Sequence, residues 1–271
     1  MATAPTMTGF IGLGEQGAPL ARNLQSAGYA TVVFDSRADA VEVLVANGAQ
    51  GAGSAAEVSA RADIVFVCVA NDEQIRNVIE GDQGVVAGMG PGGLIVVNST
   101  VSPAMIARIV DSAGARGIDV VDAPLSGGPA GAANRTVVYF VGGSEKAINR
   151  CWPLLEVSAR KIIRAGGSGA GARAKLVHQL ILCGNILAAR DGWELGRRTG
   201  LDQQVILEVI KGGAAQSLIA ERLPGISWSR HAAELFQKDL GLCLELSAQM
   251  DLVLPSARFL EQIIETITDP E

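Results

Sequence analysis

Lys175 is the residue of this chain with the clearest capacity for proton chemistry. It follows the glycine-rich stretch 166–171, which we expect to be a flexible linker, and it stands near the start of a long apolar helical pattern. The positive end of a helix dipole and partial desolvation in a cleft between domains should both lower the pKa of this lysine. A lysine that titrates nearer neutrality can act as a general acid or base. From the helical pattern alone, the alternative is a lysine that faces solvent.

Three spaced glycines form a second candidate site. Gly12, Gly14 and Gly17 follow a strand pattern and precede a helical pattern. In a dinucleotide-binding βαβ unit the first glycine permits a tight turn, the second lets the backbone approach the pyrophosphate, and the third lets helix and strand pack closely. The helix N-terminus supplies N–H donors for the phosphates. The alternative is an ordinary glycine-rich turn, but the context favours cofactor binding by Gly12, Leu13, Gly14, Glu15, Gln16 and Gly17.

The end of the second predicted strand bears on which cofactor binds. Asp35 lies there, and an acid at this position accepts hydrogen bonds from ribose hydroxyls and repels a 2′-phosphate, which favours NAD. Arg37 follows closely and could hold that phosphate, or it could be a solvated surface residue. We therefore expect NAD, with NADP possible, and include Asp35, Ser36 and Arg37 in the cofactor site.

The elements that position these residues follow from hydrophobic patterns. Strand patterns occur at 8–12, 31–35, 64–70, 94–98, 119–122, 136–141 and 161–163, and helical patterns at 19–27, 38–47, 72–80, 103–114 and from 144. Such alternation predicts a doubly wound parallel sheet with helices on both faces. Strand patterns nearly vanish later, and 171–198 is one long helical pattern with an apolar stripe of Leu176, Leu180, Cys183 and Leu187. We predict an α/β protein: a Rossmann-type domain over 1–165 and an all-helical domain over 166–271.

Composition narrows the class of protein. The chain has 271 residues, a net charge of −6 and 18% charged residues, which is typical of a globular protein of two domains. It carries no basic run that would indicate a nucleic-acid surface, and no apolar run approaches the ~20 residues of a membrane span. Residues 1–8 lack the basic and apolar regions of a secretory signal. The scattered cysteines predict free thiols in a reducing cytoplasm, and neither disulfides nor a metal site: Cys68, Cys151, Cys183 and Cys243.

Four stretches together resemble the β-hydroxyacid dehydrogenase family, typified by 3-hydroxyisobutyrate dehydrogenase and related to 6-phosphogluconate dehydrogenase. They are residues 9–17, 122–128, 169–175 and 238–240, in the family's order. The resemblance implies that Lys175 is the general acid/base and that Ser126, Gly127 and Gly128 bind a substrate carboxylate. A hydroxyl and backbone N–H groups in a glycine-rich turn suit that anion, although a plain turn is the alternative.

The resemblance also assigns residues outside these motifs. It implies that two strand-end loops flank the ribose and nicotinamide, through Val69, Ala70, Asn71 and Thr100. It implies that Lys238 reaches the cofactor cleft from the helical domain, with Asp239 as its structural partner. It further implies a homodimer or homotetramer formed through the helical domain.

Several positions depart from the family pattern. His178 and Gln179 stand where many relatives carry paired asparagines, and these positions share a helix face with Lys175. We expect both in the substrate site, although a histidine hydrogen-bonded within the domain interface is an equal alternative for His178. Arg135 replaces a usual glycine and either adds an anion contact or is a surface change. Asn98 replaces a common aspartate, Gln16 replaces a methionine, and the helical pattern ends early, near Thr268.

These features favour reversible hydride transfer between NAD(P) and a small β-hydroxy acid or the corresponding semialdehyde. Imine reductases are one alternative, because they look similar in architecture, but they usually replace the lysine with aspartate or tyrosine. A non-catalytic dinucleotide-binding scaffold is another, and relatives of that kind tend to lose the lysine. Lys175 is present here, which favours the dehydrogenase interpretation.

Overall fold

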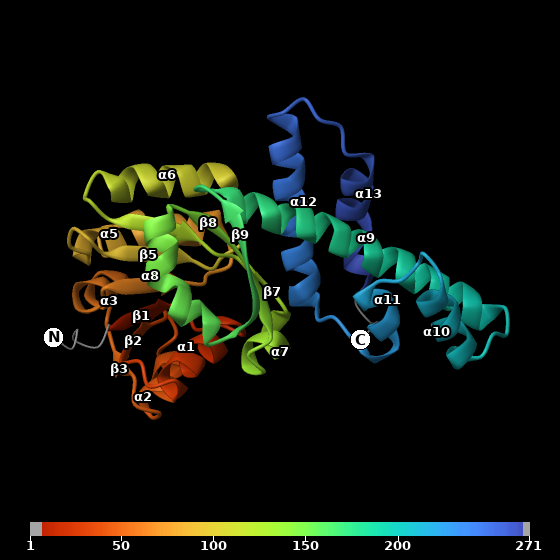
Figure 1. The fold of residues 1–271 in the computed structure, drawn as a ribbon, viewed down its shortest axis with the longest axis horizontal. Coiled ribbons are helices and arrows are strands. Elements are labelled where there is room, and N and C mark those ends of the chain that lie inside the picture. The colour runs from red at the N-terminus through yellow and green to blue at the C-terminus, as the bar shows by residue number, and fades with distance from the viewer. Residues whose placement is uncertain (1–6, 268–271) are drawn as a thin grey trace. The chain divides into compact units, whose positions relative to one another are not determined.

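The computed structural model describes residues 7–267 and divides into two compact units, Met1–Lys175 and Leu176–Glu271. The first is an α/β unit and the second is helical (Figure 1). This division falls within one continuous helix, α9 (Ala170–Arg198). The predictions for residues 1–6 and for an end near Thr268 lie outside the described residues.

The first unit is built on one nine-stranded sheet in the order β3-β2-β1-β4-β5-β6-β8-β7, with β9 paired to β8. The strands are β1 (Thr8–Ile11), β2 (Thr31–Phe34), β3 (Gln50–Gly51), β4 (Ile64–Val67), β5 (Leu94–Val97), β6 (Asp119–Asp122), β7 (Leu125–Ser126), β8 (Val137–Gly143) and β9 (Ala159–Gly166). The first six strands pair in parallel, as the alternating pattern predicts. Their carboxyl ends therefore lie along one edge of the sheet.

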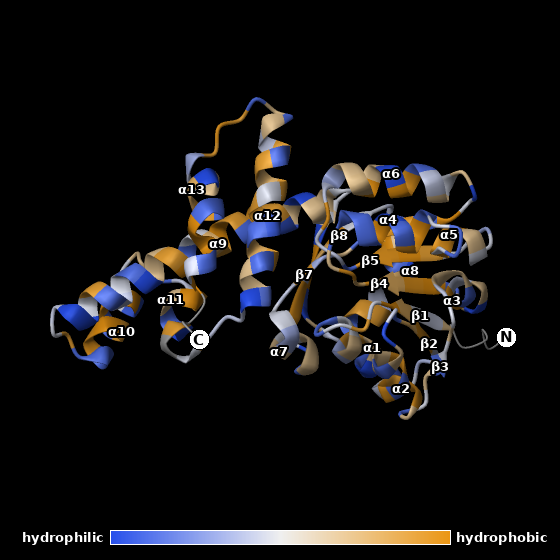
Figure 2. Cartoon of the chain, turned by 180° about the vertical axis from the view of Figure 1, so that it is seen from behind, coloured by the Kyte–Doolittle hydropathy of each residue, from blue (hydrophilic) through white to orange (hydrophobic). Residues whose placement is uncertain are grey.

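Alternate residues of the central strands enter two separate cores. In β4, Ile64 and Phe66 belong to one core, while Val65 and Val67 belong to the other. Burial on both faces explains why these strands are continuous apolar runs, visible as hydrophobic arrows in Figure 2. The first core includes residues of α1 (Gly17–Ser26), α2 (Ala38–Val45) and α8 (Glu145–Glu156), and the second includes residues of α3 (Ala55–Arg61), α4 (Asp72–Glu80), α5 (Val85–Gly88) and α6 (Pro103–Gly114).

The predicted parallel pairing is interrupted after β6, and it resumes between β8 and β9. β8 pairs antiparallel with β6, and β7 pairs antiparallel with β8. A parallel crossover needs a dozen or more residues, usually with a full helix. Here the segment between β6 and β8 contains β7 and the short helix α7 (Gly128–Ala133) in place of a full crossover helix, and β8 runs antiparallel to β6. The short elements β3, α3, α5, β7 and α7 were not predicted.

The glycine-rich stretch is packed structure, so the prediction of a flexible linker is wrong. β9 runs to Gly166 and α9 begins at Ala170. A Cβ atom at Gly171 would lie 2.4 Å from the Phe140 carbonyl oxygen, and one at Gly142 would lie 2.7 Å from the Gly171 nitrogen. Glycine is required at both positions because the backbones approach closely.

The second unit is helical in its described part. It comprises most of α9 together with α10 (Gln203–Gly212), α11 (Leu218–Arg222), η1 (Leu223–Gly225), α12 (Arg230–Ala248), α13 (Pro255–Ile263) and η2 (Ile264–Ile267). The predicted stripe on α9 faces its cores: Cys183 and Leu187 pack with Leu240 of α12, and Leu176 packs with Leu242. Within residues 7–267, no helix combines the length and apolar character needed to cross a bilayer.

Candidate active site

The dinucleotide motif lies where the strand order of the sheet reverses. The chain adds β2 and β3 on one side of β1 and then β4 and β5 on the other side. Open α/β sheets bind ligands at such a switch point. A Cβ atom at Gly12 would lie 2.2 Å from the Cys68 carbonyl oxygen and 3.0 Å from Val69 Cγ1. The fold thus brings the motif against the predicted cofactor loop that follows β4.

The three motif glycines have three different environments. Gly12 has a φ of 88°, which suits a tight turn. A Cβ atom at Gly14 would meet no described heavy atom within 4 Å, which leaves the backbone open to a ligand. A Cβ atom at Gly17 would lie 1.9 Å from the Gly12 carbonyl oxygen, so α1 could not pack as it does. These environments match the three roles of the motif, and the residues present fit a dinucleotide.

Asp35 is tied directly to the glycine motif. Its Oδ2 accepts a hydrogen bond from the Leu13 backbone nitrogen at 2.6 Å, and its Oδ1 accepts one from the Arg37 backbone nitrogen at 2.9 Å. The Arg37 side chain spans the same turn, with Nε 3.5 Å from Asp35 Oδ1 and Nη2 3.3 Å from the Leu13 carbonyl oxygen. Arg37 is therefore a neighbour of the predicted ribose site, although it is also exposed, as is Ser36. Glu15 is exposed and Gln16 half-buried beside them.

The two other predicted cofactor loops are held side by side. The Val69 nitrogen donates to Ser99 Oγ at 2.8 Å, which links the ends of β4 and β5. The Ala70 nitrogen donates to Gln74 Oε1, and Asn71 Oδ1 accepts from the Gln74 nitrogen and caps α4. Thr100 lies half-buried directly after Ser99. Ser99 was not among the predicted site residues, and its hydroxyl is the group that joins the two loops.

The predicted substrate turn depends on glycine conformations. Ser126 ends β7, and Gly127 and Gly128 have φ values of 134° and 61°, in the region that favours glycine. The Asn98 side-chain nitrogen donates to the Ala123 carbonyl oxygen at 2.8 Å, at the start of the same segment. An ionised aspartate at position 98 could not donate that hydrogen bond, which gives a physical reason for this departure from the family pattern.

Asp122 links the substrate segment to α9, a role that sequence reasoning missed. Its two carboxylate oxygens accept hydrogen bonds from the backbone nitrogens of Gly169 and Ala172, each at 2.8 Å. Burial raises the pKa of Asp122, and these N–H groups act in the opposite direction. The available signal was Gly169, because this residue precedes the helix and has no side chain to cap it.

Lys175 is buried, with 6% of its surface exposed, so the alternative of a solvent-facing lysine is not what the structure shows. It is the sixth residue of α9, and the dipole effect falls off within the first turn. The Asp122 carboxylate further offsets the positive end of the helix. The predicted effect of the helix end is therefore small at this position, and the proton chemistry of Lys175 stays a prediction.

The residues that follow Lys175 on α9 connect to α12 in the helical unit. The Gln179 side-chain nitrogen donates to Asp239 Oδ2 at 2.6 Å, and both residues are buried. Lys238 Nζ lies 3.0 Å from Asp239 Oδ1, in keeping with the expected partnership. His178 is half-buried. Asp239 thus orients both Gln179 and Lys238.

Arg135 has a backbone conformation that explains why relatives usually carry glycine at this position. Its φ is 57°, in the left-handed region. Its Nε lies 3.4 Å from Asn23 Oδ1, and the Asn23 side-chain nitrogen donates to Ala132 O and Ser158 Oγ. Asn23 therefore ties α1 to α7 and to the start of β9, and the exposed Arg135 contacts this junction from the surface.

All four cysteines, each among the described residues, are free, as predicted. Burial raises the pKa of Cys68 and Cys151 to about 12 and that of Cys243 to about 11. Thiols that remain protonated at neutral pH are poor nucleophiles. The thiols therefore do not add a candidate nucleophile to the predicted site.

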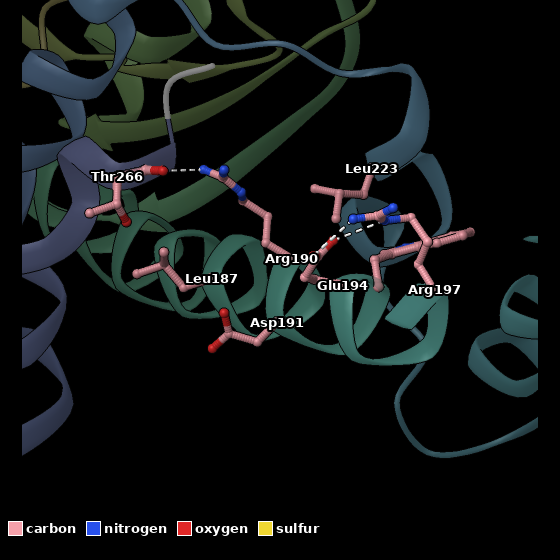
Figure 3. A pocket seen from close by; sticks show the side chains of 8 residues that line it. Leu187, Arg190, Asp191, Glu194, Arg197, Leu223 and Thr266 are labelled. Carbon is pink, nitrogen blue, oxygen red and sulfur yellow. Dashed lines mark hydrogen bonds and ion pairs between the residues drawn. The ribbon is translucent and has the colours of Figure 1, made fainter. Parts of the chain in front are cut away.

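A pocket of about 400 Å³ lies on the helical unit (Figure 3). Both of its arginines are engaged with neighbours of the same unit: Arg190 donates to the Thr266 carbonyl oxygen, and Arg197 pairs with Glu194. The lining, which includes Leu187 and Leu223, consists of residues that the motifs did not single out. We therefore separate this pocket from the candidate active site.

Comparisons with known proteins cover both units. Residues 7–167 match the family described as the NAD binding domain of 6-phosphogluconate dehydrogenase. Residues 169–270 match the family described as NAD-binding of NADP-dependent 3-hydroxyisobutyrate dehydrogenase. The two matches meet between β9 and α9, which is where the sheet pattern gives way to the helical pattern.

Individual relatives match nearly the whole chain. An NAD-dependent L-serine dehydrogenase from Pseudomonas aeruginosa is 36% identical over 87% of this chain and 83% of its own length. A 2-(hydroxymethyl)glutarate dehydrogenase from Eubacterium barkeri is 35% identical over 95% and 87%. The structure of Mycobacterium tuberculosis 3-hydroxyisobutyrate dehydrogenase with L-serine is similar with a TM-score of 0.85 and 30% identity, over 97% and 94% of the two chains. An imine reductase from Pseudomonas sp., at 18% identity and a TM-score of 0.69 over 96% and 93%, shares the fold alone.

Proposed function

The chain belongs to the β-hydroxyacid dehydrogenase family and is an NAD(P)-dependent oxidoreductase acting on CH–OH groups, and from that premise we propose how its residues divide the work. Lys175 is the general acid/base. Ser126, Gly127 and Gly128 bind the substrate carboxylate, and His178 and Gln179 contact the rest of the substrate. The cofactor site consists of Gly12, Leu13, Gly14, Glu15, Gln16, Gly17, Asp35, Ser36, Arg37, Val69, Ala70, Asn71, Thr100 and Lys238.

One observation carries the role of Lys175: it is a buried lysine on a helix whose first turn is bonded to the substrate segment. Lysine side chains are mostly exposed in folded proteins, so a buried lysine departs from the usual pattern. Desolvation favours the neutral amine, which is the form that can accept a proton. The position of this lysine thus supports proton transfer better than it supports a surface role.

The reaction requires hydride and proton transfer in one site. NAD(P), when bound, supplies the acceptor for the hydride that leaves the hydroxyl-bearing carbon. Lys175 takes the hydroxyl proton as the carbonyl forms, and it returns a proton in the reverse direction. Asp35 accepts hydrogen bonds from the ribose hydroxyls, so we propose NAD as the preferred cofactor.

The substrate class is a small β-hydroxy acid. L-serine, 3-hydroxyisobutyrate and 2-(hydroxymethyl)glutarate are named for relatives of this chain, and each carries a hydroxyl group β to a carboxylate. His178 and Gln179 replace the asparagine pair of many relatives, so we assign substrate choice among these acids to them. Asp239 supports this role because its carboxylate fixes the amide of Gln179.

The deciding experiment measures reduction of NAD and NADP with these three acids and with L-threonate, the substrate named for another relative, and it measures oxidation of NADH and NADPH with a cyclic imine. Lys175→Ala and Lys175→Arg are compared with Lys146→Ala, which alters an exposed lysine of the same unit. Arginine keeps the charge but cannot deprotonate, so both Lys175 variants should lose about 100-fold to 10,000-fold in kcat. Cofactor affinity should stay within a few-fold.

Each alternative has its own signature in this experiment. Full turnover by both Lys175 variants would exclude Lys175 as the acid/base. Reduction of the imine without turnover of any hydroxy acid would indicate an imine reductase. Tight cofactor binding without any turnover would indicate a scaffold.

We also propose that the helical unit forms a homodimer or homotetramer. Large apolar side chains that are exposed in the described residues are concentrated there, including Val177, Ile181 and Phe259, whereas the α/β unit exposes only Val43 and Val45. Clusters of exposed apolar side chains commonly mark interfaces. Ile181→Glu should lower the molar mass measured by light scattering, whereas Val43→Glu should not.

The free thiols support a cytoplasmic location.

A further inference from the structure

We propose that Asp122 is a positioning residue, whose carboxylate caps α9 and thereby holds Lys175 in register with the substrate turn at Ser126. The inference rests on the proposed role of Lys175. Asp122 stands 47 residues before Gly169 in the chain, yet its two oxygens accept the Gly169 and Ala172 backbone N–H groups at 2.8 Å.

The geometry is that of a helix cap supplied from a distant strand. Gly169 accepts the first hydrogen bond of α9, from the Arg173 nitrogen, and so occupies the N-cap position. A capping side chain normally bonds the N–H group two or three residues later, and glycine has no such side chain. Ala172 is the third residue after Gly169, and Asp122 takes its N–H group.

Water cannot replace this cap, because the site is closed. Asp122 is 1% exposed, and a Cβ atom at Gly142 would lie 2.7 Å from its Oδ1. A Cβ atom at Gly171 would lie 2.8 Å from its Oδ2. The two glycines therefore leave room for the carboxylate and for nothing larger. Without Asp122, two buried N–H groups would lack an acceptor, which is costly.

The cap links the two parts of the proposed active site that must act together, namely the substrate turn at Ser126 and Lys175 on α9. Asp122 ends β6, four residues before Ser126. Ala172 lies one helical turn before Lys175, at positions i and i+3 of α9. A shift of the first turn therefore displaces Lys175 relative to the turn that binds the carboxylate, and a displacement of about 1 Å can cost roughly 100-fold in rate.

The test compares Asp122→Asn with Asp119→Asn. Asp119 begins the same strand and makes a partly exposed ion pair with Arg150 at 3.3 Å, so its substitution controls for loss of a carboxylate from β6. The amide of asparagine at position 122 has one acceptor oxygen for one of the two backbone N–H groups, and its N–H₂ group faces the other N–H group, so that two donors oppose each other. We expect kcat with L-serine or 3-hydroxyisobutyrate to fall roughly 10-fold to 100-fold, with KM and the Kd for NAD within threefold. Asp119→Asn should stay within twofold in every parameter.

Repeating both substitutions in the Lys175→Ala background separates positioning from general damage. If Asp122 acts through Lys175, Asp122→Asn should change the residual rate of Lys175→Ala less than twofold. An equal loss in both backgrounds, or a loss no larger than that of Asp119→Asn, would overturn the inference. Full activity of Lys175→Ala would instead refute the role of Lys175, and the inference with it.

Hydrogen exchange in the unaltered protein covers the case in which Asp122→Asn does not fold. The amides of Gly169 and Ala172 should exchange at least 100-fold more slowly than in an unfolded peptide, because both donate to a buried carboxylate. Exchange at the unfolded rate would contradict the cap.

Discussion

Replacing Asp35 by asparagine should shift the cofactor preference of this enzyme toward NADP. Asp35 holds its carboxylate toward the glycine motif through the Leu13 N–H group at 2.6 Å, and Arg37 Nε lies 3.5 Å from it. Asparagine can still accept from Leu13, so the turn should survive. The substitution removes the negative charge that disfavours a 2′-phosphate and leaves Arg37 without its carboxylate partner.

Two terms set the expected size of the change. Two unit charges 4 Å apart interact by about 1 kcal/mol in water, so a phosphate of nearly two charges should gain about 2 kcal/mol when Asp35 is neutralised. NAD should lose about 1.5 kcal/mol, because its ribose hydroxyls exchange a charged acceptor for a neutral one. Together these effects shift the ratio of the Kd values for NAD and NADP by roughly 300-fold toward NADP.

Titration of each cofactor, followed by fluorescence, measures this ratio. Asp39→Asn is the matched control, because it removes an exposed carboxylate from the first turn of α2, four residues further along. That control should change the ratio less than threefold. Adding Arg37→Ala to Asp35→Asn should weaken NADP binding relative to Asp35→Asn alone, because the 2′-phosphate would lose the guanidinium beside it. The reasoning would be refuted if Asp35→Asn alone left the ratio within threefold of the unaltered protein.

Three further substitutions test other parts of the site. Gly14→Ala should keep the melting temperature, because its Cβ would meet no described atom within 4 Å, but it should weaken NAD binding at least tenfold, because the methyl group would occupy space that the pyrophosphate needs. Gly17→Ala, whose Cβ would lie 1.9 Å from Gly12 O, should lower the free energy of unfolding by about 1–3 kcal/mol or more. Equal melting temperatures of the two variants would contradict this reasoning. Arg135→Gly should be about 1 kcal/mol more stable to urea than Arg135→Ala, because only glycine adopts a φ of 57° without strain, and a more stable alanine variant would oppose that reasoning. Because burial raises the pKa of Asp122 above 3.8, the part of its contribution to stability that depends on protonation is complete below pH 3.8 and is lost as the pH rises through the folded-state pKa, whereas the hydrogen bonds of the cap remain. The free energy of unfolding of the unaltered protein minus that of Asp122→Asn should therefore decrease over that window in urea titrations at successive pH values; an increase would show that the hydrogen bonds outweigh burial.

Hydrophobic patterns predicted the architecture well where the pattern within a single strand or helix determines which residues are buried. The alternating strands and helices indicated the Rossmann-type sheet and the helical second unit, and the stripe from Leu176 to Leu187 indicated the inner face of α9. The antiparallel return at β8 was not predicted, because a strand pattern carries no information about direction. The glycine-rich stretch was misread as flexible for a related reason: a glycine can provide freedom or close contact, and only the neighbouring backbone distinguishes the two.

The sequence by itself determined the family, the reaction class and the candidate residues, because motif spacing and residue chemistry are local properties. Only the tertiary structure decided that Lys175 is buried, that Gln179 bonds to Asp239 and that Asp122 caps α9. The partners Asp122 and Gly169 lie 47 residues apart, and Gln179 and Asp239 lie 60 apart, so no local pattern records either contact. Burial and capping depend on which backbones the fold brings together, and both decide whether a lysine on a helix can transfer a proton.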